Sequence, residues 1–431
     1  MARSRVAASP LVLAGAWCLT LALATLALPT GPTYDPYSWL IWGRDLAHFG
    51  LSTRGGGTSW KPLPALIDAF LTPLGHGAAD GWVVVARAGA LYAVFMAFRL
   101  AWRLAPRGGR PLAGVIAAAT LLLTQHWLIR NGSGGAEGLM VAFGLLAVDR
   151  HLDGHRLQAF ALLVAAGLIR VEIWPFAALY GGWLWWQIPS RRTRVALAAG
   201  ALLPPLLWFG GDWVGSGHLT SASGLALRPI PGTPGDSAHP ALAVGAEALD
   251  MFPTPAWIAV AIGVVWAAVR RNRLLLVLAT SAALWTALVA VMAERGYPGE
   301  ERFLYMACAI EAVLAGVGAA SIVRYKPALT PFVTALVIAG FAYGSVPAAR
   351  QLPVDAAAVE KIADMDAGLA NTVREAGGAA DVMRCGAPTT KWYTVTALAY
   401  DLGVPATDVR WFRGAPLLKT CSRRFLLAKA A

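Results

Sequence analysis

Charged residues are scarce in this chain of 431 residues: they make up only 14% of the sequence, while hydrophobic residues make up 57%. About a quarter of the residues in a soluble globular domain are charged, so this composition excludes an ordinary soluble protein. The hydrophobic residues also form runs that are long enough to cross a lipid bilayer. The sequence therefore predicts an all-α polytopic membrane protein.

Cysteine is scarce as well, with four residues in the whole chain. None of them has a Cys-x-x-Cys or a Cys/His metal spacing, which excludes the common zinc and dithiol motifs. Cys18 and Cys308 lie in apolar runs, where cysteine behaves as a small hydrophobic residue. Cys385 and Cys421 lie in the polar C-terminal segment, and we expect them to form a disulfide if that segment is outside the cytoplasm.

Acidic residues are fewer than basic residues, 24 against 36, which gives a formal net charge of +12. The basic residues gather in short turns between apolar runs, which is where the positive-inside rule places them on the cytoplasmic face. The charge is therefore explained by membrane topology, and it does not indicate a nucleic-acid partner. No internal repeat or low-complexity tract stands out.

The apolar runs and basic turns alternate in a pattern that predicts about eleven transmembrane helices in the plasma membrane, with a cytoplasmic N-terminus and an extracytoplasmic C-terminus. Residues 1-350 would form the transmembrane domain, with outer loops 29-81 and 214-253, and residues 351-431 a small extracytoplasmic α/β domain. The first run favours an uncleaved anchor, and a signal peptide cleaved near Ala24 is the alternative. The predicted spans are Leu11–Leu28, Trp82–Leu104, Leu112–Leu128, Gly138–Val148, Leu157–Ile169, Trp174–Ile188, Val195–Trp213, Trp257–Val269, Leu274–Met292, Phe303–Val323 and Leu329–Tyr343.

The segment Thr33 to Asp45, which reads TYDPYSWLIWGRD, is the most distinctive chemical signal in the chain. It follows the first span directly, so Asp35 emerges on the far side of the membrane close to the lipid boundary. Aromatic residues flank this carboxylate, and Arg44 follows it. A functional carboxylate is one interpretation, and a solvated loop residue before a proline turn is the other.

Two predicted spans are too short to cross a bilayer. Gly138–Val148 and Leu157–Ile169 flank one charged turn, and neither covers a hydrocarbon core of about 30 Å at 1.5 Å per residue. If both runs are straight helices, Glu137 and Glu172 lie roughly 20 Å and roughly 24 Å above that turn. An ionisable group at such a depth needs a protein partner or a water-filled cavity. The pattern predicts a recessed site that contains both glutamates.

Further charged residues at the outer ends of the spans complete the candidate site. A carboxylate can take a proton from an acceptor hydroxyl, and arginine can bind a phosphate through two parallel hydrogen bonds. We therefore select Asp35, Glu137 and Glu172 as candidate catalytic residues. The candidate substrate-binding residues are Arg44, Arg170, Arg302, Lys61 and Arg54.

Each candidate also has a structural interpretation. Arg170 and Glu172 can form only an internal ion pair, although their i,i+2 spacing points them apart on a regular helix. Glu137 can belong to a flexible glycine-rich loop, and Arg302 can be an arginine that extends to the membrane interface. On the inner face, the sequence indicates that Asp149 and Asp153 belong to a solvated turn.

Several short motifs, taken in order, resemble those of GT-C fold glycosyltransferases. Asp35-Pro36-Tyr37 is similar to the Asp-Pro-Tyr/Trp segment of oligosaccharyltransferase catalytic subunits, and Glu301-Arg302-Phe303 resembles the Arg-Tyr that opens a late span in that family. Gly135-Ala136-Glu137 resembles the family's Ser-Gly-Leu-Glu element, and Arg170-Val171-Glu172 its Arg-Pro-Glu, with Ala136 and Val171 as departures. The likeness covers roughly residues 10 to 350 and is nearest to GT-C-like proteins of high-GC actinobacteria. No Trp-Trp-Asp motif is visible, which makes an Asn-glycosylating enzyme an unlikely match.

The resemblance implies an integral membrane glycosyltransferase that uses a polyprenyl-phosphate-linked sugar outside the cytoplasm, with inversion at the anomeric carbon. The acceptor would be a cell-envelope glycan, lipid or protein. Asp35 would be the general base or would orient the acceptor, Glu137 would share that role or hold a divalent cation (Mg, Mn or Ca) together with Asp35, and Arg302, with Arg170, would steady the departing phosphate. The alternatives are a lipid-linked-sugar transporter or flippase and a non-catalytic envelope scaffold.

Overall fold

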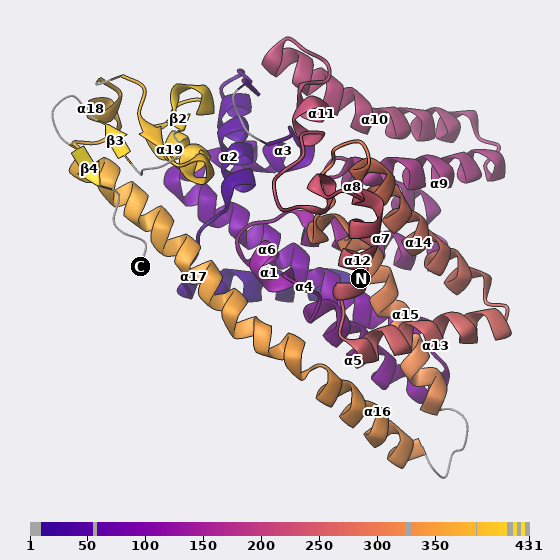
Figure 1. The fold of residues 1–431 in the computed structure, drawn as a ribbon. Helices are drawn as coiled ribbons and strands as arrows, with labels where there is room; N and C mark the ends of the chain where they lie inside the picture. The colour runs from indigo at the N-terminus through magenta and orange to yellow at the C-terminus, as the bar shows by residue number, and fades with distance from the viewer. Residues whose placement is uncertain are drawn as a thin grey trace, which may run out of the picture.

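The computed structural model describes residues 10–54, 58–323, 330–384, 386–411, 417–419 and 424–426. Helices dominate these residues, and the strands are short (Figure 1). Five helices in the described part are long and apolar enough to cross a membrane, or up to seven if each of two bent helix pairs counts as one span. The predicted all-α polytopic membrane protein is therefore confirmed, whereas the count of about eleven spans stays a prediction.

The centre of the bundle is α15 (Tyr305–Val323), which is buried along almost its whole length. It packs against α4 (Ala78–Leu104), α5 (Arg110–Leu122) and α13 (Thr254–Val269). Small residues allow this close approach: a Cβ atom on Gly318 would clash with the backbone carbonyl of Ala259 in α13. In a lipid environment such small-residue contacts are a main source of helix association.

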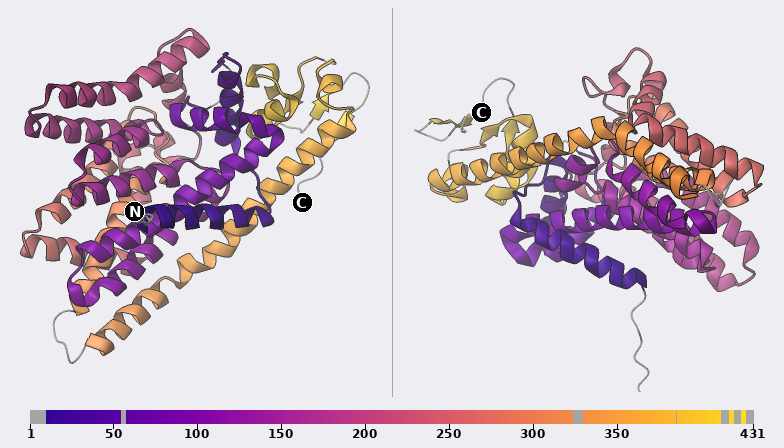
Figure 2. Two further views of the ribbon diagram at one scale, coloured as in Figure 1. Left: turned by 180° about the vertical axis from the view of Figure 1, so that it is seen from behind. Right: turned by 90° about the horizontal axis from the view of Figure 1, so that it is seen from below.

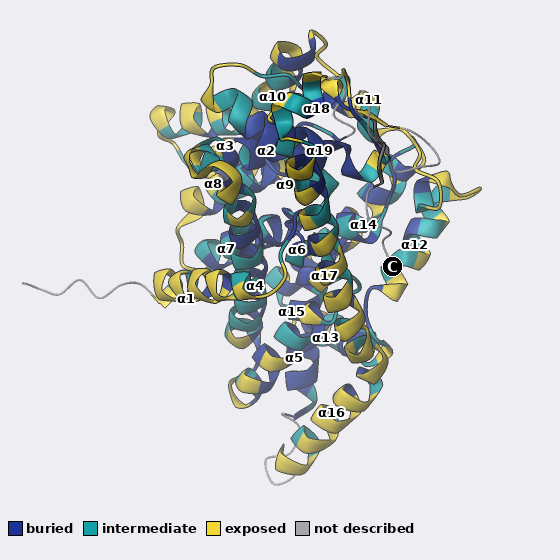
Figure 3. Cartoon of the chain, turned by 90° about the vertical axis from the view of Figure 1, so that its left-hand side faces the viewer, coloured by how far each residue is buried: buried dark blue, intermediate teal, exposed yellow. Residues whose placement is uncertain are grey.

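The helices around this centre are apolar on their exposed faces. In α1 (Pro10–Ala24), for example, only Cys18 and Ala22 are buried, although the whole helix is apolar. An exposed helix that is apolar on all sides is typical of a membrane span, and Figure 3 shows exposed residues along α1 and α16. The other helices of the bundle are α8 (Arg156–Gly167), α9 (Trp174–Gln187), α10 (Arg191–Ser216), α12 (Pro240–Asp250), α14 (Arg273–Ala293) and α16 (Thr330–Gly344), together with α7 (Glu137–Leu152), which packs against α4 and has no exposed residue.

The predicted outer loop 29-81 contains two helices, α2 (Tyr34–Ala47) and α3 (Pro62–Leu71). Residues Pro36 to Gly43 of α2 are all buried. The interpretation of Asp35 as a solvated loop carboxylate is therefore wrong, because Asp35 lies in the first turn of a packed helix. The predicted span Leu112–Leu128 is also interrupted: α5 ends at Leu122, and α6 (Trp127–Gly132) begins after His126, whose φ is 56°.

The C-terminal part begins with the long helix α17 (Val346–Glu375), which runs along the outside of the bundle after α16 (Figure 2). The helix ends before Gly377 and Gly378, whose φ angles of 96° and 88° favour glycine. Short elements follow, and α19 packs against α2 (Figure 1). These elements are α18 (Ala379–Arg384), α19 (Val395–Leu402), the parallel pair β1 (Thr389–Thr390) and β2 (Arg410–Trp411), and the antiparallel pair β3 (Leu417–Lys419) and β4 (Arg424–Leu426).

Candidate functional site

The candidate residues lie where helices begin or are interrupted. Asp35 is in the first turn of α2, and Glu137 is the first residue of α7. Carboxylates are favoured at these positions, because the N-terminal end of a helix carries free N–H groups and a partial positive charge. Arg302 belongs to the short 3-10 helix Glu301–Phe303 that precedes α15. Such interruptions allow charged side chains to turn inward at the edge of an apolar bundle.

The outer part of the site is the ion pair between Asp35 and Arg302. A nitrogen of Arg302, Nη1, donates a hydrogen bond to Asp35 Oδ2 over 2.8 Å, and Arg302 Nε lies 2.8 Å from Glu300 Oε2. The side chains of Asp35 and Arg302 are 22% and 20% exposed. Both groups are therefore ordered by protein partners and still accessible to a ligand.

The inner part of the site is centred on Arg170. Its Nη2 donates a hydrogen bond to Glu137 Oε1 over 2.8 Å, and its Nη1 donates to the hydroxyl of Tyr297 over 3.1 Å. That hydroxyl in turn donates to Glu172 Oε1 over 2.7 Å. The side chains of Arg170, Glu137 and Glu172 are only 6%, 3% and 1% exposed. These three residues form the buried part of the site, next to the outer ion pair.

The backbone explains why Arg170 and Glu172 lie together despite their i,i+2 spacing. Arg170 has an extended conformation (φ −143°, ψ 130°) between α8 and the 3-10 helix Val171–Ile173. The helix is interrupted at this point, so Arg170 Nη1 comes within 3.7 Å of Glu172 Oε1. The remaining oxygen of Glu172, Oε2, has no hydrogen-bond partner among the described residues.

Lys61 lies between the outer and the inner parts. Its Nζ is 3.9 Å from Glu137 Oε1 and 4.6 Å from the ring centroid of Trp39. Burial, together with the charge of Arg170, lowers the pKa of Lys61 to about 8. Burial alone would raise the pKa of Asp35, but the charges of Arg302 and Lys61 outweigh it and lower that pKa to about 2. We refer to Asp35, Lys61, Glu137, Arg170, Glu172 and Arg302 as the charged cluster.

Two residues of this region were not selected from the sequence. Tyr297 joins Arg170 to Glu172, and Arg130 binds Glu301 over 2.7 Å beside Arg302. Tyr297 lies in the loop ERGYPGEER, whose charges mark it as notable, but a tyrosine in a polar loop gives no signal of its own. Arg130 resembles any other basic residue at a span end, and only the interruption after α5 brings it to Glu301.

Other predicted residues lie outside the charged cluster. Arg44 donates a hydrogen bond to the backbone carbonyl of Val404, and Arg54 to that of Ser216. Both side chains therefore tie separate segments together. Cys385 and Cys421 lie outside the described residues, so their disulfide stays a prediction.

The inner charged turn differs from its prediction. Asp149 is fully buried and binds Arg99, Arg103 and Arg150, so its interpretation as part of a solvated turn is wrong. Asp153 is 29% exposed and binds Arg103 and Arg150. The turn is therefore a cluster of ion pairs around a buried carboxylate.

The residues predicted to hold a divalent cation do not fit that task. Among the described residues, no group of three or more His, Cys, Asp or Glu side chains is arranged to hold a metal ion. Asp35 and Glu137 face Arg302, Arg170 and Lys61 instead. Each of these carboxylates is already paired with a cation of the protein, so it does not offer the free oxygen ligands that a divalent cation requires.

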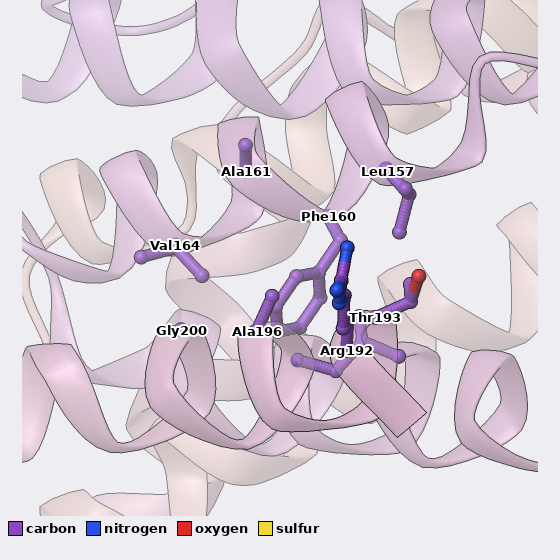
Figure 4. Close-up of a pocket in the computed structure, with 9 residues that line it drawn as sticks. Leu157, Phe160, Ala161, Val164, Arg192, Thr193, Ala196 and Gly200 are labelled. Carbon is purple, nitrogen blue, oxygen red and sulfur yellow. The ribbon is translucent and has the colours of Figure 1, made fainter. Parts of the chain in front are cut away.

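A separate groove of about 460 Å³ lies between α8 and α10 (Figure 4). Its lining is mainly apolar, with Phe160, Val164 and Leu197, and its polar groups come from Arg192 and Thr193. It contains no carboxylate, so it offers no group for proton transfer. The charged cluster is therefore the better candidate for a reactive site.

Comparison with family models and with curated proteins gives no match. Among solved structures, the oligosaccharyltransferase of Archaeoglobus fulgidus matches in two forms. The form tethered to an acceptor peptide with the NVT sequon has a TM-score of 0.47 at 12% identity, and the match covers 91% of this chain and 63% of that one. The apo form has a TM-score of 0.46 at 13% identity, with 93% and 64% covered. This chain thus spans less than two thirds of those structures, and a likeness at this level adds no argument about the site.

Proposed function

We propose that this chain is a GT-C-type membrane glycosyltransferase that transfers a sugar from a polyprenyl-phosphate donor to a cell-envelope acceptor on the extracytoplasmic face of the plasma membrane. The observation that carries this proposal is the pairing of a partly exposed carboxylate, Asp35, with a partly exposed cation, Arg302, next to a buried group of charged residues. Glycosyl transfer from a lipid phosphate needs both groups: a carboxylate to accept a proton and a cation to hold a phosphate.

The proposed reaction is a single displacement at the anomeric carbon. The acceptor hydroxyl gives its proton to the carboxylate of Asp35, and its oxygen forms a bond to the anomeric carbon. At the same time the bond from that carbon to the phosphate oxygen breaks, and the electron pair leaves with the polyprenyl phosphate. Arg302 binds the phosphate, which gains a negative charge, and the positive charge of the buried Lys61 stabilises it. Attack on the face opposite the leaving group inverts the configuration.

The donor would also activate the base. With Arg302 bound to Asp35, the pKa of this carboxyl is about 2, which makes it a weak base at neutral pH. A phosphate that draws Arg302 away removes one of the two charges that lower this pKa. The pKa of Asp35 then moves toward the range in which a general base is effective. Binding of the donor would therefore precede deprotonation of the acceptor.

The buried residues Glu137, Arg170 and Glu172 have a positioning role in this proposal. Glu137 and Arg170 form an ion pair that is nearly closed to solvent, and Lys61 lies against Glu137. The charge of Asp35 also acts on Lys61, so the ammonium group lies within electrostatic range of both carboxylates. A group that is held by packing and ion pairs loses little freedom when a phosphate binds, which strengthens the interaction.

Turnover by the purified protein tests this function against the two alternatives. Protein in lipid nanodiscs is incubated with undecaprenyl-phosphate mannose or decaprenyl-phosphate arabinose, each radiolabelled in the sugar, and an envelope extract as acceptor. We expect labelled acceptor and free polyprenyl phosphate to appear together. Movement of intact donor across a proteoliposome membrane without cleavage would favour the flippase, and neither activity would favour the scaffold.

The pH profile provides a second test, because Lys61 titrates near the working range. Its pKa is lowered from 10.5 to about 8 in the fold. Between these values the unfolded chain carries more protons at this position, so the contribution of Lys61 to stability rises with pH. The ammonium group needed for the phosphate is lost over the same interval. We expect donor KM to rise above pH 8 while the thermal midpoint does not fall.

The variant Lys61→Arg is the matched control for this profile, since arginine keeps its charge in proteins. It should bind the donor with little pH dependence between pH 7 and about pH 10. A wild-type KM that does not change across this interval, measured under the same conditions, would contradict the role of Lys61 in phosphate binding.

A further inference from the structure

Three aromatic side chains from opposite ends of the chain meet at the end of α2 that carries Asp35. Tyr34 precedes Asp35 in α2, and Trp392 and Tyr393 belong to the 3-10 helix that precedes α19. The ring centroids of Tyr34 and Trp392 are 6.2 Å apart, and those of Trp392 and Tyr393 are 5.6 Å apart. We refer to these three residues as the aromatic patch.

Trp392 makes the aromatic patch accessible to solvent, and hydrogen bonds hold the segments that carry the patch in place. Trp392 is 61% exposed, while Tyr34 and Tyr393 are half-buried. The hydroxyl of Thr396 in α19 donates a hydrogen bond to the backbone carbonyl of Tyr34 over 2.9 Å. The hydroxyl of Tyr37 donates to Asp366 of α17 over 3.1 Å. These contacts fix the C-terminal segment against the first turns of α2, so the position of the patch relative to Asp35 is set by the fold.

The position and the composition of the patch indicate a binding surface. Tyr34 and Asp35 are consecutive residues in the first turn of α2, so the patch and the carboxylate of Asp35 belong to the same end of this helix. Packing does not require a large exposed indole, and exposed aromatic residues with a polar rim mark binding sites. Lys391 supplies such a rim, with its Nζ 5.7 Å from the ring centroid of Tyr393.

The chemistry of the patch fits a carbohydrate. One face of a sugar ring presents C–H groups, and the edges present hydroxyls. The face of an aromatic ring carries partial negative charge and attracts such C–H groups, and the ammonium of Lys391 can donate hydrogen bonds to hydroxyl oxygens. A sugar that stacks on Trp392 would lie at the end of α2 that carries Asp35, where the proposed reaction needs an acceptor.

We infer that the aromatic patch of Tyr34, Trp392 and Tyr393 is the acceptor subsite and that the acceptor is a glycan rather than a lipid or a protein. This inference rests on the proposed function, because it assigns the acceptor of that reaction. It also gives the C-terminal segment a role: this segment completes the acceptor side of a site whose donor side lies among the membrane helices.

Binding of soluble oligosaccharides tests the inference without turnover. Saturation-transfer NMR is recorded on the full-length protein in nanodiscs with mannotetraose, cellotetraose and an arabinofuranosyl tetrasaccharide. We expect a saturable signal from at least one of them, retained in Trp392→Phe and lost in Trp392→Ala. Trp411→Ala is the matched control, because Trp411 is 58% exposed in the same segment and has no ring contact among the described residues.

Turnover then separates this inference from the proposed function. With glycan acceptor, Trp392→Ala should raise the acceptor KM at least tenfold, whereas Trp411→Ala should leave it unchanged. Glycan binding without any donor cleavage would contradict the proposed function and keep the subsite. Donor cleavage with no glycan signal, or an equal loss in Trp411→Ala, would overturn the subsite. Quenching of Trp392 emission by brominated phospholipids, measured as the difference between wild type and Trp392→Phe, would assign the patch to the membrane interface and also overturn it.

Discussion

The variant Asp35→Asn is expected to lower kcat for sugar transfer by about 10² to 10⁴, the range over which a positioned general base contributes. Asparagine has nearly the same shape as aspartate, but it cannot accept the proton of the acceptor hydroxyl. It also removes the negative charge that faces Arg302 across 2.8 Å. Arg302 then loses a competitor for the phosphate, so KM for the donor should fall or stay constant while kcat falls. Steady-state transfer with radiolabelled donor measures both parameters.

The control for this experiment is Asp45→Asn. Asp45 lies in the same helix and pairs with Arg44 over 3.7 Å, outside the charged cluster. Its replacement should leave kcat within about twofold, since a partly exposed pair of this kind contributes little. If Asp35→Asn and the wild type turn over equally, Asp35 is not the base, and the mechanism proposed here fails at its central step.

The location of Asp35 after the first apolar helix could be predicted because the signal is local. An apolar run followed directly by a carboxylate among aromatic residues places that carboxylate at the end of a span, whatever the rest of the chain does. The helix that carries Asp35 was not recognised, since α2 packs against α3 and α19 and its buried face follows from those partners. Burial by distant segments is a tertiary property that a local pattern does not contain.

The meeting of Glu137 and Glu172 could also be predicted, from the length of two runs. Runs too short to cross the membrane predict a common depth for their ends, and the structure joins the two glutamates through Arg170 and Tyr297. The participation of Tyr297 could not be predicted, because its hydroxyl reaches Glu172 only once a loop more than a hundred residues away has folded over it.

The failure of Arg44 and Arg54 to join the cluster has the same physical origin. On sequence grounds they are outer-face arginines like Arg302. Arg302, however, precedes the most buried helix of the bundle and is drawn inward with it, whereas Arg44 and Arg54 find backbone carbonyls at the periphery. Proximity to a central helix, which periodicity alone does not reveal, distinguishes a site arginine from a structural one.

The outer and the inner parts of the charged cluster have different roles: the outer part binds substrate, and the inner part stabilises the fold. Asp35 and Arg302 are accessible and can exchange partners with a substrate, whereas Glu137, Arg170 and Glu172 are closed to solvent and cannot. A substitution in the outer part should therefore change kcat or KM, and one in the inner part should first change the free energy of unfolding. This difference leads to the largest expected effect on folding.

The variant Arg170→Met is expected to lower the free energy of unfolding by about 3–5 kcal/mol, the cost of removing one partner from a buried ion pair. Arg170 holds Glu137 at 2.8 Å and Glu172 at 3.7 Å, and both carboxylates are almost fully buried. Methionine fills similar space but leaves both negative charges without their principal partner. Thermal unfolding of the detergent-solubilised protein should show a markedly lower midpoint and loss of transfer activity.

Adding Glu137→Gln and Glu172→Gln to Arg170→Met should restore much of this loss, because neutral amides remove the uncompensated charges while keeping the shape of the side chains. The control is Arg384→Met, which breaks a surface pair with Asp381 in which the arginine side chain is 76% exposed. An exposed pair contributes at most about 1 kcal/mol, so its midpoint should stay close to that of the wild type. If the triple variant is no more stable than Arg170→Met, charge burial is not the cause, and the packing of Arg170 against Phe303, whose ring centroid lies 4.2 Å from its guanidinium carbon, would account for the effect instead.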